Sequence, residues 1–210
     1  MKRLFTLSVL LAGALAFASS CKETKEYDDH ANWKQRNVHF IDSIAIQCDL
    51  NSTAYASIDE IPEGQLFKIT SYKLDPGKIH GNGSYVYCTK ISRGDTSESP
   101  QYTDSVRVNY RVRLIPTRNY PEGQIVDRSF KTETLDPAVN IPSSFAVAGL
   151  IDGVVSALLH MHCGDFWRLY VPQELGYGTS DKTDIPGYSA LIFEINLTEI
   201  APTGQELSPR

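Results

Sequence analysis

The chain has 210 residues, of which 41% are hydrophobic, and its 25 acidic residues outnumber its 20 lysines and arginines to give a formal net charge of −5. This length suits one compact domain with an appendage. An acidic chain without a run of basic residues lacks the electrostatic footprint of a nucleic-acid-binding protein, so that class of function is excluded.

The first residues have the pattern of a secretory signal peptide. Lys2 and Arg3 precede an apolar run, Leu4 to Phe17, and three small residues follow it. The run is shorter than the ~20 apolar residues that a membrane-spanning helix needs. We therefore predict a signal peptide over residues 1–20, whose removal takes away two positive charges and leaves a net charge of −7.

Cys21 closes this segment, and Ala18-Ser19-Ser20-Cys21 resembles a bacterial lipobox in which alanine replaces the usual leucine. One interpretation is an ordinary signal peptide cleaved near Ala18, with Cys21 an incidental thiol. We favour a lipoprotein whose Cys21 carries the lipid, because a cysteine at this place otherwise has no explanation. Residues 21–31 then form a polar tether. The protein is expected in the envelope of a Gram-negative bacterium, anchored to the outer membrane and facing the periplasm or the cell surface.

Three further cysteines, Cys48, Cys88 and Cys163, allow one disulfide at most and leave a free thiol, and the pairing stays open. Their spacing matches no zinc pattern. His160 and His162 lie beside Cys163, but residues i and i+2 of a helix point apart, so we predict no metal site there.

Residues 32–83 are predicted to be an N-terminal extension of unknown role. Its first part has apolar residues at near-helical spacing, which predicts one amphipathic helix from Asn32 to about Leu50. A short strand is predicted from Leu66 to Tyr72. The helix is expected either to pack on the following domain or to pair two chains, and we favour packing; the oligomeric state stays open.

Residues 84–201 are predicted to form the main domain, followed by a tail over residues 202–210. Strands are expected at Tyr85–Ile91, Phe166–Val171 and Leu191–Ile200. Between the first two, apolar residues from Val106 to Leu114 alternate with polar ones, which predicts a half-buried strand with a solvated back. The arginines and Asn109 would lie on that back.

One short helix is predicted in this domain. Leu150, Val154 and Leu158 recur at intervals of four, Asp152 suits the positive end of the helix dipole, and Gly164 is expected to close the helix. Antiparallel strands wrapped around one short helix give an α+β fold.

The segment that follows the strand Phe166–Val171 is predicted to build a small apolar cup. Tyr177 lies between two glycines, a proline-bearing loop from Asp184 to Gly187 follows, and an apolar strand leads to Glu194. Such a cup needs no catalytic acid, base, metal or cofactor, and its natural substrate is a proline ring.

Taken in order, six motifs make residues 85–200 similar to one family, the FKBP-type peptidyl-prolyl cis-trans isomerases. They are Val108-Asn109-Tyr110, Gly123 to Asp127, Val147 to Gly153, Met161 to Asp165, Leu175 to Gly178, and Ile185 to Glu194. The resemblance implies an antiparallel sheet over a short helix, which agrees with the fold read from the residues.

The resemblance also implies roles for individual residues. Tyr110 and Phe193 would be aromatic walls and Leu150 the floor. The backbone N–H of Val147 and the hydroxyl of Tyr177 would donate to substrate carbonyls. Asp127 would be the polar group at the edge, with Val126 and Ile185 contacting the substrate.

This chain departs from the family at several of these positions. Val126 stands where the family commonly has phenylalanine, and Leu150 where eukaryotic members have tryptophan. Residues 131–144 do not align cleanly; Ala138 is nearest by spacing to the second wall phenylalanine, and Phe145 is a candidate to replace it. A less aromatic cup offers a proline less apolar contact.

The implied activity is isomerisation of X–Pro bonds in exported polypeptides, by removing water from the amide and stabilising its twisted state. Proline-containing polypeptides are the expected partners, and macrolide inhibitors are expected ligands of the same cup. The alternative is a non-catalytic module that keeps the fold and binds a peptide or an envelope protein.

Overall fold

The computed structural model of the protein describes residues 28–78, 81–94, 98–136 and 139–209. The predicted signal peptide and Cys21 lie outside these residues. Within the described ranges, no helix is both long and apolar enough to cross a membrane.

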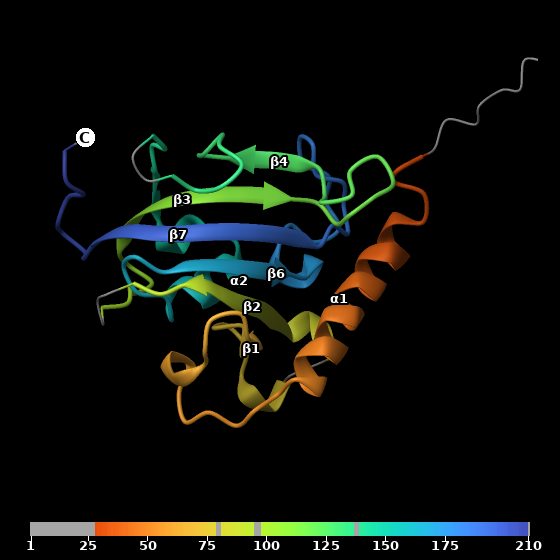
Figure 1. The fold of residues 1–210 in the computed structure, drawn as a ribbon, viewed down its shortest axis with the longest axis horizontal. Coiled ribbons are helices and arrows are strands. Elements are labelled where there is room, and N and C mark those ends of the chain that lie inside the picture. Colours follow the sequence, from red (N-terminus) through yellow and green to blue (C-terminus); the bar gives the residue numbers. More distant parts are fainter. Residues whose placement is uncertain (1–27, 79–80, 95–97, 137–138, 210) are drawn as a thin grey trace, which may run out of the picture.

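A seven-stranded antiparallel sheet forms the body of the protein (Figure 1). Its strands lie in the order β1-β2-β6-β7-β3-β4, and β5 pairs with β3 beside β4. The strands are β1 (Leu66–Thr70), β2 (Tyr85–Ser92), β3 (Ser105–Arg113), β4 (Ile125–Arg128), β5 (Ser143–Ala146), β6 (Phe166–Val171) and β7 (Leu191–Ala201). The predicted α+β fold is confirmed, whereas the short strands β4 and β5 were not predicted.

The short helix α2 (Asp152–Leu158) lies behind the sheet and packs against β1, β2 and β6 (Figure 1). Val154, Val155 and Leu158 are buried there, as the apolar spacing predicts. Two details of the prediction were wrong. Leu150 precedes the helix, and Gly164 does not close it but forms, with φ +93°, the turn before β6.

The outer face of β3 is not solvated as predicted. Asn109 is 1% exposed, and the side chain of Arg111 is only 8% exposed because it is paired with Glu194 of β7. Arg111 Nε and Nη2 donate to Glu194 Oε2 at 2.9 and 2.5 Å, and the guanidinium lies 4.7 Å from the ring centre of Phe130. Arg168 of β6 donates to the other carboxylate oxygen at 2.7 Å. Arg111 on this face is therefore paired with a carboxylate across the sheet instead of being exposed to solvent.

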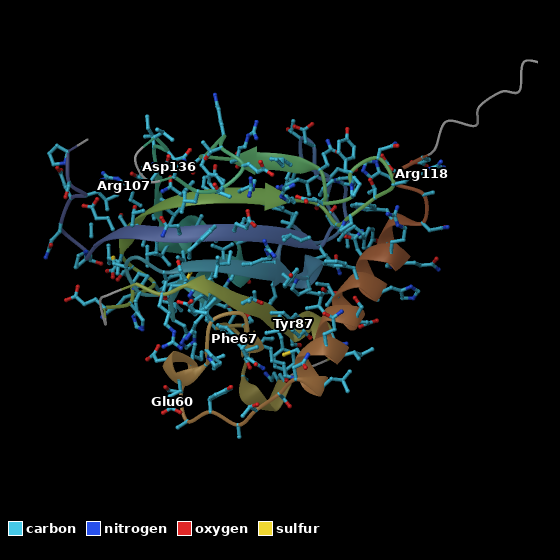
Figure 2. All side chains as sticks on the ribbon, in the orientation of Figure 1. Glu60, Phe67, Tyr87, Arg107, Arg118 and Asp136 are labelled. Carbon is cyan, nitrogen blue, oxygen red and sulfur yellow. The ribbon has the colours of Figure 1, made fainter. Side chains whose placement is uncertain are left out.

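The N-terminal extension packs on the sheet, as we favoured. Helix α1 (Trp33–Leu50) runs along one end of the strands, and β1 pairs with β2, opposing Phe67 to Cys88 (Figure 1). The ring of Phe67, which is labelled in Figure 2, also lies edge-on to the ring of Trp167, with centroids 5.4 Å apart. The sheet and its core therefore begin well before residue 84.

Cys48 and Cys88 are buried free thiols in the structure, and Cys163 is partly buried. His162 is hydrogen-bonded on both ring nitrogens, to Ser99 Oγ and to Asp59 Oδ1, each at 3.0 Å. Among the described residues, no group of three or more histidines, cysteines and acidic residues is arranged to hold a metal ion.

Candidate active site

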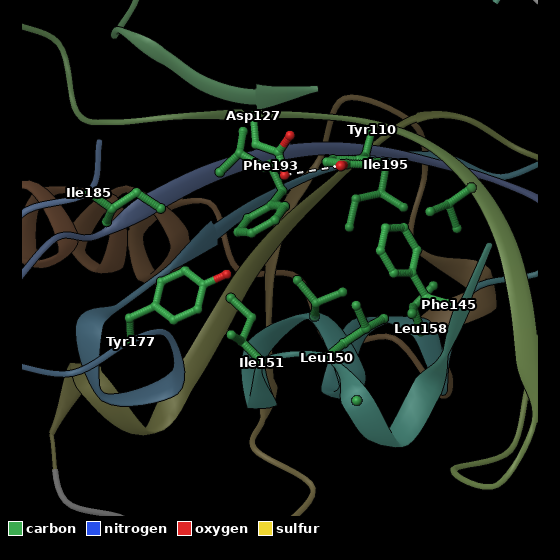
Figure 3. Close-up of a pocket in the computed structure, with 14 residues that line it drawn as sticks. Tyr110, Asp127, Phe145, Leu150, Ile151, Leu158, Tyr177, Ile185, Phe193 and Ile195 are labelled. Atoms are coloured by element: carbon green, nitrogen blue, oxygen red, sulfur yellow. Dashed lines mark hydrogen bonds between the residues drawn. The ribbon is translucent and has the colours of Figure 1, made fainter. Parts of the chain in front are cut away.

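A cavity of about 280 Å³ lies between the inner face of the sheet and the segment that leads into α2 (Figure 3). Apart from Asp127, the side chains that line it are apolar or aromatic. They are Val108, Tyr110, Val112, Asp127, Phe145, Leu150, Ile151, Val154, Leu158, Tyr177, Ile185, Phe193 and Ile195, with Gly149 contributing backbone.

The sheet supplies the walls through the register of β3 and β7. Tyr110 is directly opposite Ile195, and Val112 is directly opposite Phe193, so all four face the cavity. The predicted inward positions of Tyr110 and Phe193 are confirmed.

A third ring comes from β5. The Phe145 ring lies edge-to-face with that of Tyr110, with centroids 5.6 Å apart and planes at 71°. β5 pairs with β3, which brings Phe145 opposite Val106 and its side chain onto the cavity side. Phe145 thus provides the additional aromatic wall for which it was a candidate; Ala138 lies outside the described residues.

The floor is formed by the turn before α2 and by the first turns of the helix. Leu150 and Ile151 precede the helix, and Val154 and Leu158 lie on its cavity face (Figure 3). Leu150 lies at the floor of the cavity, the position expected from the sequence. Ile151 was missed, although its position between Leu150 and the helix start is a usable signal.

Polar groups gather at one edge. The Tyr110 hydroxyl donates to Asp127 Oδ2 at 3.0 Å, and the other carboxylate oxygen of Asp127 accepts from the backbone N–H of Arg128 at 2.8 Å. Burial, and then the hydrogen bond to Asp127, raise the pKa of Tyr110 to about 12. Both Asp127 oxygens are thus engaged within the protein, and Tyr110 keeps its proton at neutral pH.

Tyr177 stands on the opposite rim with its hydroxyl directed into the cavity (Figure 3). It is 40% exposed, and its hydroxyl has no hydrogen-bond partner within the described part of the chain. Gly178, with φ +65°, allows the chain to turn directly after it. Burial, and then the charge of Asp127, raise the pKa of Tyr177, so this hydroxyl is a free, protonated donor at the cavity mouth.

Ile185 lines the cavity from the loop that precedes β7. The loop tip closes as a small hairpin, in which the Lys182 N–H donates to the Ile185 carbonyl at 2.8 Å and the Ile185 N–H donates back at 3.3 Å. The predicted cavity position of Ile185 is therefore found in the structure.

Two predicted site residues do not reach the cavity. Val147 is fully buried, and its N–H, which we expected to meet a substrate, donates to the carbonyl of Asp104 at 3.0 Å as the pairing of β5 with β3 continues. Val126 packs against the core instead of lining the cavity, because Asp127, the next residue of β4, takes the cavity-facing position opposite Val112.

Comparison with known proteins points to one family. Residues 96–198 match the family described as FKBP-type peptidyl-prolyl cis-trans isomerase. The chain is 39% identical over 102 residues to the FKBP-type 22 kDa peptidyl-prolyl cis-trans isomerase of Escherichia coli strain K12, covering 48% of this chain and 43% of that protein. It is 33% identical over 134 residues to the peptidyl-prolyl cis-trans isomerase Mip of Coxiella burnetii, covering 63% and 51%.

Among solved structures, the crystal structure of a peptidyl-prolyl cis-trans isomerase from Pseudomonas syringae superposes with a TM-score of 0.53 at 21% identity, over 84% of this chain and 98% of that chain. This likeness supports the fold alone. The chain spans about half the length of the curated relatives that it matches.

Proposed function

We propose that the protein catalyses cis-trans isomerisation of X–Pro bonds in polypeptides, because residues 96–198 match the FKBP-type peptidyl-prolyl cis-trans isomerase family. The observation that carries the proposal is the cavity itself. Three aromatic rings and an aliphatic floor surround a space with one free hydroxyl donor, Tyr177, at its mouth.

The chemistry asks little more of the site. Rotation about a peptide bond meets a barrier of ~18–20 kcal/mol from amide resonance. An X–Pro bond therefore isomerises only in tens to hundreds of seconds unaided. A cavity that excludes water removes the hydrogen bonds that favour the planar, charge-separated amide, and a shape that fits the twisted amide lowers the barrier further.

In this proposal the proline ring enters between Tyr110, Phe193 and Phe145 and rests on Leu150. The Tyr177 hydroxyl donates to a substrate carbonyl at the rim. Asp127 acts through Tyr110, whose ring it holds by the 3.0 Å hydrogen bond. No proton is transferred at any step.

The activity is tested with an assay in which a protease cleaves only the trans form of a proline-containing peptide, with and without rapamycin. The wild-type protein is expected to accelerate isomerisation, with rapamycin inhibiting it, and Tyr177→Ala and Phe193→Ala are expected to lose most of the acceleration. Wild-type rates equal to those of both variants would exclude catalysis by this cavity.

One observation favours a second candidate, a non-catalytic module that binds a peptide or an envelope protein. The Val147 N–H, the donor that the family resemblance implies, is already bonded to Asp104, which leaves the cavity with one donor fewer for a substrate. Binding of a proline peptide without any acceleration of isomerisation would support this second candidate.

We further propose that the protein is a lipoprotein of the bacterial envelope, held by lipid on Cys21 after removal of residues 1–20. The charged start, the apolar run and the cysteine that closes it support this. Detergent-phase partitioning of cells expressing wild-type and Cys21→Ala protein tests it. The wild type is expected in the detergent phase and the variant in the aqueous phase; partitioning of both into water would refute the anchor.

A further inference from the structure

The loop between the short helix Gln173–Leu175 and β7 carries two residues of the cavity, Tyr177 and Ile185. Hydrogen bonds within the segment itself stabilise its first turn and its tip. The Gly178 N–H donates to the Gln173 carbonyl at 2.9 Å, and the Gly187 N–H donates to Asp181 Oδ1 at 2.7 Å. These bonds fix the internal shape of the loop but not its position against the sheet.

The end of the loop is bound to the N-terminal helix. Trp33 Nε1 donates to Ser189 Oγ at 2.9 Å, and the Ala190 N–H donates to Asn37 Oδ1 at 2.7 Å. All four residues are buried. The amide of Asn37 is oriented by its own Nδ2, which donates to the Trp33 carbonyl at 2.8 Å. Two buried hydrogen bonds therefore join α1 to the end of the loop, between residues more than 150 positions apart in the sequence. We call this contact the junction.

Tyr188 connects this junction to the cavity rim. Its φ of +65° is unfavourable for a residue with a side chain and persists where surrounding contacts impose it. Two contacts do so: its N–H donates to the Gly178 carbonyl at 2.8 Å, and Lys34 Nζ of α1 lies 4.5 Å from its ring centre. Gly178 directly follows Tyr177, so a contact with α1 is relayed to the hydroxyl at the cavity mouth.

We propose that α1 positions the proline cavity, with Trp33 and Asn37 as positioning residues that set where Ile185 and Tyr177 stand against the substrate. This inference rests on the proposed isomerase function and gives the N-terminal extension a role in it. Neither Trp33 nor Asn37 lines the cavity, so both act through Ser189 and Ala190.

Two variants test the proposal in the full chain. Trp33→Phe removes the indole donor while keeping an aromatic ring, and Asn37→Ala removes the acceptor of the Ala190 N–H. Ile44→Ala is the matched control, because Ile44 is buried in the same helix about two turns beyond Asn37, against the core and away from the loop. Activity is measured at a temperature where urea titrations show every variant to be folded.

The loss of one buried hydrogen bond is expected to lower kcat/KM by roughly 3- to 10-fold in each of the two variants. The Ile185 methyl resonance should shift, and the Ala190 amide should exchange faster with solvent. Ile44→Ala should lower stability and leave kcat/KM and the Ile185 resonance unchanged. The Ile185 resonance can be measured without catalysis, so it tests the positioning role of α1 separately from the proposed isomerase activity.

Wild-type kcat/KM and an unshifted Ile185 resonance in both Trp33→Phe and Asn37→Ala would overturn the positioning role. An equal loss of activity in Ile44→Ala would overturn it too, because general destabilisation would then account for the effect. If the wild-type chain is inactive, the isomerase proposal fails, and the Ile185 resonance alone decides whether α1 positions the loop.

Discussion

Replacing Phe145 by alanine is the sharpest test of the proposed binding of proline in the cavity. The ring stands edge-to-face with Tyr110 and forms the wall that the sequence alone left without a definite occupant. The substitution removes the ring but leaves the backbone pairing of β5 with β3 in place. Any change in substrate affinity then reports on the ring itself.

The magnitude follows from contact area. A buried aromatic side chain covers about 150–250 Å², and a wall ring would present about a quarter of that, roughly 40 Å², to a proline. At ~25 cal/mol per Å² this contributes about 1 kcal/mol, or about a fivefold fall in kcat/KM. The edge-to-face pair with Tyr110 contributes a further ~0.5–1.5 kcal/mol to folding, so the variant should also be less stable.

The protease-coupled assay measures kcat/KM, and urea unfolding measures stability. Phe40→Ala is the matched control, because Phe40 is also partly buried and pairs with a tyrosine ring, that of Tyr170 at 6.0 Å, but on the outer face of the sheet. It should lose stability and keep its activity. A kcat/KM within a factor of about two of the wild type in Phe145→Ala would refute the assignment of this ring as a wall.

Three other expectations follow from the charged and hydroxyl groups. Activity should be flat between about pH 6 and 9, because the raised pKa values of Tyr110 and Tyr177 keep both hydroxyls protonated; a step in the kcat/KM profile there would contradict this. Since folding raises the pKa of Tyr110 to about 12, its contribution to stability is present below its ordinary value of 10.0 and lost as the pH rises through about 12. Tyr110→Phe should therefore flatten the alkaline end of a urea-unfolding series. Glu194→Gln should cost about 3 kcal/mol of stability, because Arg111 stays buried without its counter-charge. Burial alone would raise the pKa of Glu194, but hydrogen bonds from Arg168 and Arg111 hold that pKa below its ordinary value. The stabilisation from this pair is therefore present above the ordinary pKa of a glutamate and is lost as the pH falls through the lowered pKa. An unchanged unfolding midpoint in Glu194→Gln at neutral pH would refute the role of the pair.

Much of the fold could be predicted because its strands carry strong local patterns. The alternation along β3 and the apolar run of β7 identified both strands, and with them the inward positions of Tyr110 and Phe193. The four-residue strands β4 and β5 have too few residues to show a period, so they were missed.

The outer face of β3 could not be predicted from its own residues. Alternating arginines predict a face exposed to solvent unless a buried partner is known. The partner of Arg111 lies 83 positions away, on β7. Only the strand order, which places β3 between β7 and β4, brings Glu194 opposite Arg111. Local pattern decided which side chains share a face, and the topology decided what covers that face.

Within the site, the errors have the same origin. The resemblance identifies positions by order along the chain, but whether a side chain or an N–H faces the cavity depends on strand register. β5 stays paired with β3 up to Ala146, and the Val147 N–H then bonds to Asp104. On β4, Asp127 takes the inward position and Val126 does not. Phe145 could be named as a candidate but not placed, because the preceding segment aligns poorly.

In the proposed mechanism a cavity with so few polar groups acts through its shape, and that shape depends on groups outside it. Arg111 and Glu194 are directly opposite each other on β3 and β7, and their neighbours Tyr110, Val112, Phe193 and Ile195 form the sheet wall of the cavity. A slip of either strand by one residue would turn that strand's part of the wall outward and bring its charged residue toward the cavity. The buried ion pair therefore fixes the register of the wall from behind, as α1 fixes the loop from the side. In the proposed mechanism, stabilisation of a twisted amide by fit requires both, because a displaced wall distinguishes the twisted amide less well from the planar one.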